Sequence, residues 1–362
     1  MSASNLKYFS QLDGLRAFAI ISVMIGHWMS WDTQNLILKN SPWGHGVILF
    51  FVLSGYLISN ILFELKEKID AKLITPPQAL KTFYIRRFLR IFPVYYLLIF
   101  YLYSINFANT REIFPWLVTY TSNLLQAKTG TYIGDFNHFW SLAVEEQFYL
   151  IWPFLILFVD RKKIMKIIIA FMIISFLSRL SCYLISKDNW MLGAYFTPNL
   201  FLPLALGALL SYAKRYRASL ASFFDKSLWL YISISIYLVS YYALRYKLHI
   251  AAFDMLIDEY LYAFACVFII SRASSNKFKF ISKYILEHDI VVFTGKISYG
   301  LYIYHLFVIN FFWNYLAPEF KMGVQDKHAM WLAYFVVAYL MAIISYYVIE
   351  KPMNSLKNHF NY

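Results

Sequence analysis

Apolar stretches as long as a lipid bilayer is thick recur along the whole of this chain. A helix needs about 20 predominantly apolar residues to cross the hydrocarbon core. Ten windows of about that length occur, at 14–32, 46–65, 91–107, 139–159, 164–186, 197–213, 228–244, 255–271, 297–316 and 329–350. They predict an all-α polytopic membrane protein, a bundle of about ten transmembrane helices. The piece 113–125 is more polar and is predicted to be a surface or re-entrant helix.

The amino-acid composition is also that of a membrane protein. Hydrophobic residues make up 60% of it and charged residues 15%, and the 34 Phe, 31 Tyr and 10 Trp suit the aromatic belts of membrane interfaces. The first residues lack the basic region and cleavage site of a signal peptide, so we expect the first window to remain as an anchor. No repeat or linker divides the chain, which predicts one transmembrane domain over 1–362 with no appended soluble domain.

The charges of the loops predict the orientation of the chain. With the N-terminus placed in the cytoplasm, the inner segments hold 23 Lys and Arg and the outer segments hold 8. Cytoplasmic loops of membrane proteins carry an excess of these residues, so both termini are predicted to be cytoplasmic. This bias also accounts for most of the net charge of +13. Nucleic-acid binding explains the charge poorly, because the basic residues lie in short loops beside the spans.

Ionisable residues interrupt the first window. Arg16 and His27 are eleven residues apart, which on a helix is about three turns and roughly 16.5 Å. They therefore share one helix face, and Asp13 lies close to the same stripe. Titratable side chains inside a span are costly and by default mark a functional site. A buried structural histidine is the alternative interpretation.

A cluster of arginines precedes the third window. Arg86, Arg87 and Arg90 are adjacent or three to four residues apart, so on a helix they form one cationic patch. Guanidinium groups fit phosphate oxygens. The patch therefore predicts a phosphate-bearing cytosolic ligand, although ordinary positive-inside charge would also explain it.

The fourth window carries two adjacent carboxylates, Glu145 and Glu146. Carboxylates in an apolar helix need partners or protons. Counting residues from the helix ends puts Glu145 and His27 at a similar depth in the outer half of the membrane. Glu145 could then orient the His27 imidazole, as the acid does in a catalytic triad. Arg179 falls at a similar depth and could balance the second carboxylate; a buried structural carboxylate–Arg pair is the alternative.

Polar residues also mark the ninth window, where Ser298, Tyr302 and His305 share one helix face. They either line a ligand path or hydrogen-bond neighbouring helices, as polar groups in membrane bundles do. The two cysteines, Cys182 and Cys266, lie in apolar stretches without a CxxC spacing and predict neither a disulfide nor a metal site.

Six motifs, taken in order, resemble the membrane-bound acyltransferase 3 family, which includes bacterial O-antigen and exopolysaccharide O-acetyltransferases. The resemblance covers nearly the whole chain, and six motifs in sequence are far more specific than any one. The motifs are Leu12-Asp13-Gly14-Leu15-Arg16 with an Arg-x10-His spacing to His27; Phe50-Phe51-Val52-Leu53-Ser54-Gly55-Tyr56-Leu57-Ile58; Arg87-x-x-Arg90; Trp140-Ser141-Leu142-x-x-Glu145-Glu146-Gln147-Phe148-Tyr149; Ile297-Ser298-Tyr299-x-Leu301-Tyr302-x-x-His305; and Ile349-Glu350-Lys351-Pro352.

The resemblance implies an integral membrane O-acyltransferase. Such an enzyme moves an acyl group, by default acetyl, from cytoplasmic acyl-CoA to a hydroxyl of a carbohydrate such as O-antigen, capsule or exopolysaccharide. It further implies a bacterial cytoplasmic (inner) membrane location, no metal and no permanently bound cofactor. The expected partners are acyl-CoA, a carbohydrate or lipid-linked glycan acceptor, and the bilayer. Many relatives carry an extra soluble domain, so we expect this chain either to act alone or to use a separate periplasmic acyl-transfer partner.

Acyl transfer from a thioester needs a base for the incoming hydroxyl or a nucleophile to hold the acyl group, and His27 can serve as either. The expected catalytic residues are His27, Glu145 and Glu146. Acyl-CoA is expected to bind Arg16, Arg86, Arg87 and Arg90. The further residues expected to line the site are Asp13, Ser54, Trp140, Ser141, Arg179, Ser298, Tyr299, Tyr302 and His305.

A secondary transporter is the main alternative, because buried Arg, His and Glu residues would suit one. Transporters are commonly built from paired repeats with helices broken by Gly or Pro, whereas this chain has 12 Gly, 10 Pro and no internal repeat. A membrane scaffold would leave the buried charges without a purpose. The sequence leaves open the acceptor, which could also be peptidoglycan or a small natural product, the acyl group, which glutamate acts, and the oligomeric state.

Overall fold

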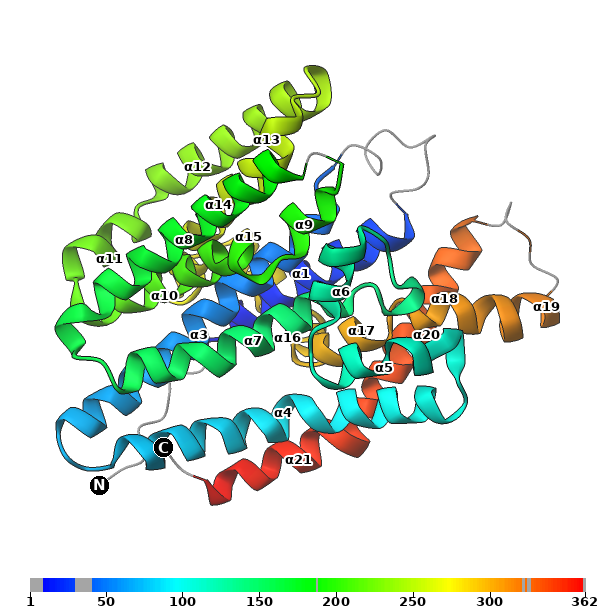
Figure 1. The fold of residues 1–362 in the computed structure, drawn as a ribbon, viewed down its shortest axis with the longest axis horizontal. Helices are drawn as coiled ribbons and strands as arrows, with labels where there is room; N and C mark the ends of the chain where they lie inside the picture. The colour runs from blue at the N-terminus through cyan, green and yellow to red at the C-terminus, as the bar shows by residue number, and fades with distance from the viewer. Residues whose placement is uncertain (1–8, 30–40, 187, 321–322, 324–326, 361–362) are drawn as a thin grey trace.

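The structure, a computed structural model, describes residues 9–29, 41–186, 188–320, 323 and 327–360, and at 281–283 it describes the backbone alone. Within these ranges all regular secondary structure is helical and no strand occurs. The all-α prediction is therefore confirmed. Figure 1 shows a bundle in which α4 and α21 lie along one edge and α11 to α14 along the opposite edge.

Long helices make up most of the bundle. They are α1 (Ser10–Trp28), α3 (Gly46–Asp70), α4 (Pro76–Ser104), α7 (Phe139–Leu157), α8 (Ile164–Ile185), α10 (Phe201–Tyr216), α12 (Ser227–Ser240), α14 (Asp258–Ala273) and α20 (Lys327–Ser345). Shorter helices connect or extend them: α5 (Thr110–Val118), α6 (Ser122–Thr129), α9 (Trp190–Tyr195), α11 (Ala218–Asp225), α13 (Ala251–Leu256), α15 (Ile281–Leu286), α16 (Asp289–Lys296), α17 (Ser298–Tyr304), α18 (Phe307–Phe311), α19 (Ala317–Glu319) and α21 (Lys351–Ser355).

Turns of other helix types complete the chain. Three π-helical segments continue α12, α18 and α20; these are η6 (Tyr241–Lys247), η7 (Phe312–Leu316) and η8 (Tyr346–Glu350). Short 3-10 helices are η1 (Trp43–His45), η2 (Phe107–Asn109), η3 (Gly134–Phe136), η4 (Arg161–Lys163), η5 (Thr197–Leu200) and η9 (Leu356–His359).

Each of the ten predicted windows overlaps helical structure, and the end of the first window lies outside the described residues. Among the described residues, four helical stretches are long and apolar enough to cross a membrane: Trp43–Asp70, Arg161–Ile185, Ser227–Lys247 and Lys327–His359. A fifth is added if Pro76–Ser104 and Phe107–Val118, bent by 119° at their junction, are counted as one broken span. The structure therefore supports a polytopic membrane protein, while ten spans and the orientation stay predictions.

The segment 113–125 forms parts of α5 and α6. The α5 helix folds back against α4, and two tyrosines of α4 hold it there. The hydroxyl of Tyr95 donates to the Leu117 carbonyl at 2.9 Å, and that of Tyr96 donates to the Val118 carbonyl at 2.8 Å. The prediction of a surface or re-entrant helix at 113–125 stays open, because this bent pair could be either a broken span or a re-entrant segment.

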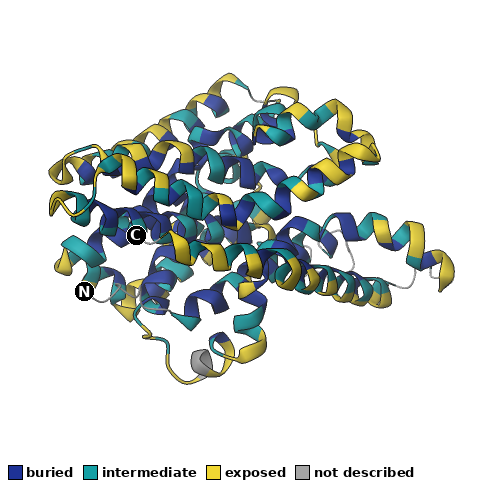
Figure 2. Ribbon diagram, turned by 90° about the horizontal axis from the view of Figure 1, so that it is seen from below, coloured by how far each residue is buried: buried dark blue, intermediate teal, exposed yellow. Residues whose placement is uncertain are grey.

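The outer faces of the bundle are apolar and exposed, as a lipid-facing surface requires. On α20, Leu332, Val336, Leu340 and Ile344 recur every four residues and are all exposed. A spacing of four keeps them on one helix face. Figure 2 shows exposed residues along the outer helices and buried residues between them. A continuous apolar stripe of this kind marks a membrane or partner-facing surface.

The centre of the bundle is α3, whose most apolar stretch is 72% buried. Glycines allow its backbone to approach that of α10 closely. A Cβ atom added to Gly55 would lie 2.0 Å from the Leu204 carbonyl oxygen, and one added to Gly207 would lie 2.1 Å from the Val52 carbonyl oxygen. One turn further along α3, Trp152 of α7 donates from Nε1 to Ser59 Oγ at 2.9 Å. These contacts fix the helices that carry the candidate site.

The α4 helix begins well before the third apolar window because Thr75 starts it with a capping box. The Gln78 amide donates to Thr75 Oγ1 at 3.4 Å, and the Thr75 amide donates to Gln78 Oε1 at 2.9 Å. Such reciprocal bonds satisfy donors that a helix start leaves unpaired. As a result Arg86, Arg87 and Arg90 all lie within α4. Their side chains do not all project from the same face of this helix.

Candidate active site

One uninterrupted helix, α1, carries both Arg16 and His27, as the sequence predicted. Arg16 lies near its beginning, where Nη1 bonds Asp13 Oδ1 at 2.5 Å. His27 lies in its last turn. The two residues line different pockets, so α1 connects two parts of the site.

The imidazole of His27 bonds that of His305. His27 Nδ1 and His305 Nε2 are 2.7 Å apart, and the planes of the two rings are nearly parallel, with an interplanar angle of 9° and centroids 5.0 Å apart. His305 lies between α17 and α18, where the ninth predicted window is broken. The break therefore places a second histidine directly against the first.

The broken helix leaves main-chain carbonyls free, and side chains satisfy them. His305 Nδ1 bonds the Tyr302 carbonyl oxygen at 2.7 Å, Trp28 Nε1 donates to the His305 carbonyl at 3.0 Å, and His138 Nε2 bonds the Ile303 carbonyl at 3.2 Å. Irregular backbone inside a membrane protein requires such substitutes. Three aromatic side chains, from α1, from the break itself and from the residue before α7, thus stabilise the break.

These bonds determine which nitrogen of His27 carries a proton. A carbonyl oxygen only accepts, so His305 Nδ1 must be the protonated nitrogen. In a neutral ring the other nitrogen, His305 Nε2, then accepts, and His27 Nδ1 must donate to it. The lone pair of His27 is left on Nε2. The Nε2 atom of His27 is therefore the ring nitrogen that could accept a proton or act as a nucleophile.

His138 and Tyr302 pack against His305. The His138 ring meets that of His305 edge-on with centroids 4.9 Å apart. Tyr302 donates its hydroxyl to the His138 carbonyl at 2.8 Å and lies 2.5 Å from Ser141 Oγ. Sequence reasoning missed His138, although it directly precedes the Phe139-Trp140-Ser141 run. A histidine at the start of an apolar helix was the available signal.

A first pocket, which we call the arginine pocket, lies between α1, α3, α4, α7 and α17, with an open volume of about 110 Å³. Its polar lining consists of Arg16, Ser54, Arg87, Arg90, Ser141, Glu145, Tyr149, Ser298, Tyr299 and Tyr302. Its remaining lining is Val47, Phe50, Phe51, Leu53, Leu57, Ile91 and Leu142. The structure thus brings together residues that the sequence selected on five separate helices.

The three arginines before the third window separate. Arg87 and Arg90 line the arginine pocket, and the Arg87 guanidinium lies over the Tyr149 ring, 5.0 Å from its centroid. Arg86 instead donates from Nη1 to the carbonyls of Lys357 and Phe360, at 2.9 and 2.7 Å. Arg86 is adjacent to Arg87, and neighbours on a helix point about 100° apart. The single patch predicted from sequence is therefore divided between a pocket and the C-terminal segment.

The two carboxylates also point to different places. Glu145 lines the arginine pocket, where Ser54 Oγ donates to its Oε1 at 2.6 Å. Glu146 lines a neighbouring cavity together with Arg87 and Tyr120. The partner that orients His27 is His305, which corrects the expectation that Glu145 takes this role. Matching depths did not bring the two groups together, because depth fixes only one coordinate of a side chain.

A second pocket, which we call the acidic pocket, lies beyond His27 and has a volume of about 570 Å³. Its polar and aromatic lining includes His27, His45, Trp140, Arg179, Trp190, Tyr195, Tyr241, Arg245, Asp254, Asp258, Glu259 and Tyr302. Val47 and Tyr302 line both pockets. His27 is therefore placed next to the point where the two cavities approach each other.

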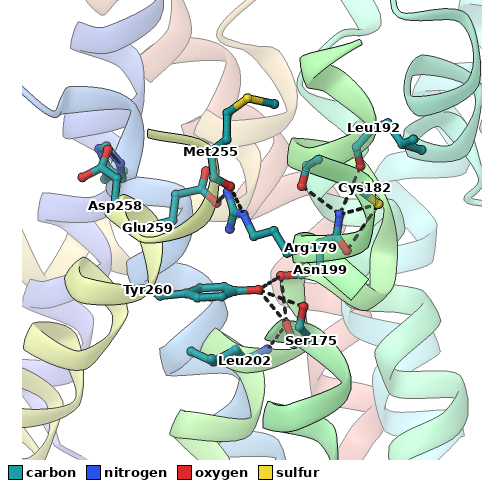
Figure 3. Close-up of polar contacts among 12 residues, drawn as sticks. Ser175, Arg179, Cys182, Leu192, Asn199, Leu202, Met255, Asp258, Glu259 and Tyr260 are labelled. Atoms are coloured by element: carbon teal, nitrogen blue, oxygen red, sulfur yellow. Dashed lines mark hydrogen bonds and ion pairs between the residues drawn. The ribbon is translucent and has the colours of Figure 1, made fainter. Parts of the chain in front are cut away.

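Arg179 belongs to the acidic pocket and pairs with a different carboxylate from the ones expected. Its Nη2 lies 2.7 Å from Glu259 Oε2, and its Nε donates to the Met255 carbonyl at 2.6 Å. Figure 3 shows the side chain reaching from α8 toward these two groups. The prediction that Arg179 balances Glu145 or Glu146 is wrong, because α13 and α14 supply the nearer oxygen atoms.

The remaining predicted residues lie close to the two pockets. Trp140 lines the acidic pocket and stacks on Tyr195, with centroids 4.8 Å apart. Tyr299 lines the arginine pocket and donates its hydroxyl to the Ile91 carbonyl at 2.6 Å.

Within the described part of the chain, no group of three or more His, Cys, Asp or Glu is arranged to hold a metal ion.

The amino-acid sequence of the chain is similar to a known protein family and to named relatives. The acyltransferase domain family matches residues 9–350 of the chain. The O-acetyltransferases OatA of Staphylococcus aureus strains NCTC 8325 / PS 47 and COL are each 31% identical to the chain over 379 residues. The matches cover 96% of this chain and 57% of each relative, so the chain spans little more than half their length. No solved structure matches it.

Proposed function

The chain belongs to the acyltransferase domain family, and we propose that it is an integral membrane O-acyltransferase. Its donor is acyl-CoA, with acetyl as the default acyl group, and its acceptor is a carbohydrate hydroxyl. The observation that carries this proposal is the His27 imidazole, which keeps its Nε2 lone pair free and lines the acidic pocket, while Val47 and Tyr302 line both that pocket and the arginine pocket.

The arginine pocket supports an anionic donor. Arg16, Arg87 and Arg90 line it with a single carboxylate, Glu145, so its lining is positive. Coenzyme A carries phosphates at one end, which guanidinium groups bind well. Its uncharged pantetheine arm is extended and ends in the thioester. Apolar side chains such as Phe50 and Leu142 suit that arm, which would bring the thioester to Tyr302 and His27.

The chemistry follows from the tautomer of His27. Nε2 takes the proton of the acceptor hydroxyl as the hydroxyl oxygen bonds the thioester carbonyl carbon. The C–S bond then breaks, and the departing thiolate of coenzyme A takes the proton back from the imidazolium. His305 stabilises that imidazolium by accepting from Nδ1, since its own Nδ1 is bound to the Tyr302 carbonyl. The products are an ester and free coenzyme A, so no further reactant is needed.

A direct transfer and a covalent acyl-His27 intermediate make different predictions. Rapid quenching of the enzyme with labelled acetyl-CoA alone leaves label on the protein only if Nε2 first attacks the thioester. We propose the general-base route, in which label accumulates only on the acceptor.

The proposed location is the bacterial cytoplasmic membrane, with both termini inside. The distribution of Lys and Arg supports this orientation, since 23 of them lie in the segments assigned to the cytoplasm and 8 outside. In that orientation the start of α4 is cytoplasmic, and the end of α1 and the start of α3 lie toward the outer face. Donor and acceptor then approach His27 from opposite faces of the membrane.

Sealed, oriented vesicles test the proposal and separate it from a transporter. With labelled acetyl-CoA on the cytoplasmic face and a soluble glycoside on the other, we expect an O-acetylated glycoside and no uptake of the free sugar. Flux of unmodified glycoside without any acetyl ester would establish the transporter instead. Full activity with donor and acceptor both on the cytoplasmic face would remove the through-membrane part of the proposal.

A further inference from the structure

The acidic pocket holds a buried arginine with an unused donor. Arg179 is only 3% exposed, and three contacts fix it: Glu259, the Met255 carbonyl and the Tyr260 ring, 4.9 Å below the guanidinium. Its Nη1 has no hydrogen-bond partner among the described residues. Buried donors are nearly always paired. Because Arg179 lines the pocket, a bound ligand can supply the missing acceptor.

Asp258 presents the complementary group, an unused acceptor. Its Oδ2 bonds Arg245 Nη1 at 2.6 Å and lies 3.2 Å from His45 Nε2. Its Oδ1 has no hydrogen-bond partner in the described part of the chain, although the residue is fully buried. The pocket therefore offers at least one fixed donor and one fixed acceptor to a ligand. A hydroxyl-rich molecule can satisfy both, since each hydroxyl donates and accepts.

Aromatic rings form another part of the wall. Trp140 and Tyr195 stack on each other, and Trp190 meets Tyr195 with centroids 5.8 Å apart. All three line the acidic pocket. The C–H faces of a sugar ring are apolar while its edge carries hydroxyls, so aromatic faces and edge-directed polar groups suit it together. The volume of about 570 Å³ is also that of a pocket for a small ligand, about 300–1,000 Å³.

The charges of the two pockets are opposite. Three carboxylates (Asp254, Asp258, Glu259) and two guanidinium groups (Arg179, Arg245) line the acidic pocket, which is negative by one charge when His45 is neutral. The arginine pocket has three guanidinium groups and one carboxylate. An anion is therefore favoured on one side of His27 and disfavoured on the other.

We infer that the acidic pocket is the acceptor site and that it selects a neutral or amino-bearing sugar ring over an anionic one. This inference rests on the proposed function, because the pocket is an acceptor site only if His27 transfers an acyl group. The sugar ring packs on Trp140 and Trp190, and its hydroxyls bind Arg179 Nη1 and Asp258 Oδ1. A further hydroxyl then reaches His27 at the inner end of the pocket, while the negative lining repels uronic acids.

Binding and transfer are measured separately on the full chain in lipid nanodiscs. The probes are methyl glucoside, methyl glucosaminide and methyl glucuronide, and saturation-transfer NMR reports their binding without any turnover. We expect the glucoside and the glucosaminide to bind. The affinity for the glucuronide should be lower by a factor of about ten or more. Asp258→Asn removes one negative charge and should reduce that discrimination. Trp190→Ala should weaken glucoside binding about three- to tenfold, as loss of one aromatic contact does.

Two variants elsewhere in the bundle serve as matched controls. Asp225→Asn removes a carboxylate that bonds Lys277 at 2.6 Å, and Trp229→Ala removes a tryptophan that is 37% exposed; neither lines the acidic pocket. Trp190 is 46% exposed, so its variant tests the inference even if Asp258→Asn fails to fold.

Each outcome decides between the two claims. Absence of glycoside binding, equal binding of glucuronide and glucoside, or binding by the Asp258 and Trp190 variants that matches their controls would overturn the acceptor site. Binding as expected without transfer of label from acetyl-CoA would retain the sugar site and overturn the proposed enzyme.

Discussion

The imidazoles of His27 and His305 lie parallel and share a hydrogen bond of 2.7 Å between His27 Nδ1 and His305 Nε2. The two residues are 278 positions apart in the chain. The Tyr302 carbonyl fixes the proton of His305, and His305 in turn fixes that of His27. A main-chain carbonyl thus performs, through an intermediate ring, the orienting task that a carboxylate performs in a catalytic triad.

Removing the base tests this arrangement most directly. His27→Ala should lower acyl transfer by about 10²- to 10⁴-fold, the usual contribution of general acid–base catalysis. Binding of acetyl-CoA should persist, since the arginine pocket does not include His27. Transfer is measured with labelled acetyl-CoA, with His249→Ala at an exposed position as control. Near-normal turnover in His27→Ala would end its assignment as base.

The role of His305 is positional and can be distinguished from a structural one. We expect His305→Ala to lower kcat about 10- to 100-fold, the cost of losing an orienting partner at metal-bound histidines, with little change in KM for acetyl-CoA. His305→Gln can place an amide oxygen where Nε2 stood and should recover part of the loss. If Gln and Ala reduce kcat equally while both proteins fold, the orienting bond does not matter.

Substitution of Arg87 or Arg90 should affect acetyl-CoA binding more than substitution of Arg86. Arg87→Ala and Arg90→Ala each remove a cation from the arginine pocket, and a hydrogen bond to a charged group is worth about 1.5–3 kcal/mol. We expect acetyl-CoA affinity to fall about 10- to 100-fold, with a smaller effect on kcat at saturation. Arg86→Ala should have a smaller effect on affinity, because Arg86 binds the carbonyls of Lys357 and Phe360. Equal effects of Arg86→Ala and Arg87→Ala in equilibrium binding would contradict this division.

The close approach of α3 and α10 predicts a stability effect away from the chemistry. In Gly55→Ala the new Cβ would lie 2.0 Å from the Leu204 carbonyl oxygen, so the helices must separate. Overpacking of this kind costs about 1–3 kcal/mol. Gly44→Ala is the control, because an added Cβ there meets nothing within 4 Å and should change stability by about 0.5 kcal/mol or less. Thermal unfolding in detergent compares them; equal midpoints would show that α3 and α10 adjust freely.

The sequence by itself determined the helical architecture and the features that lie within one helix. Hydrophobic windows predict helices because burial in lipid depends on each segment's own composition. The shared helix of Arg16 and His27 was predictable for the same reason, since about 100° per residue relates them without any other segment. The sequence also selected the arginines and the polar residues of the ninth window, many of which line the arginine pocket.

Only the tertiary structure decided which of these groups meet. Counting residues gives the depth of a side chain in the membrane, but the rotation and packing of each helix decide where it points. For this reason Glu145 bonds Ser54 while His305 bonds His27. The packing of the helices likewise places Arg179 beside Glu259. The break at His305 likewise depends on side chains of other helices that satisfy its carbonyls, and a single segment carries no signal of partners that packing alone supplies.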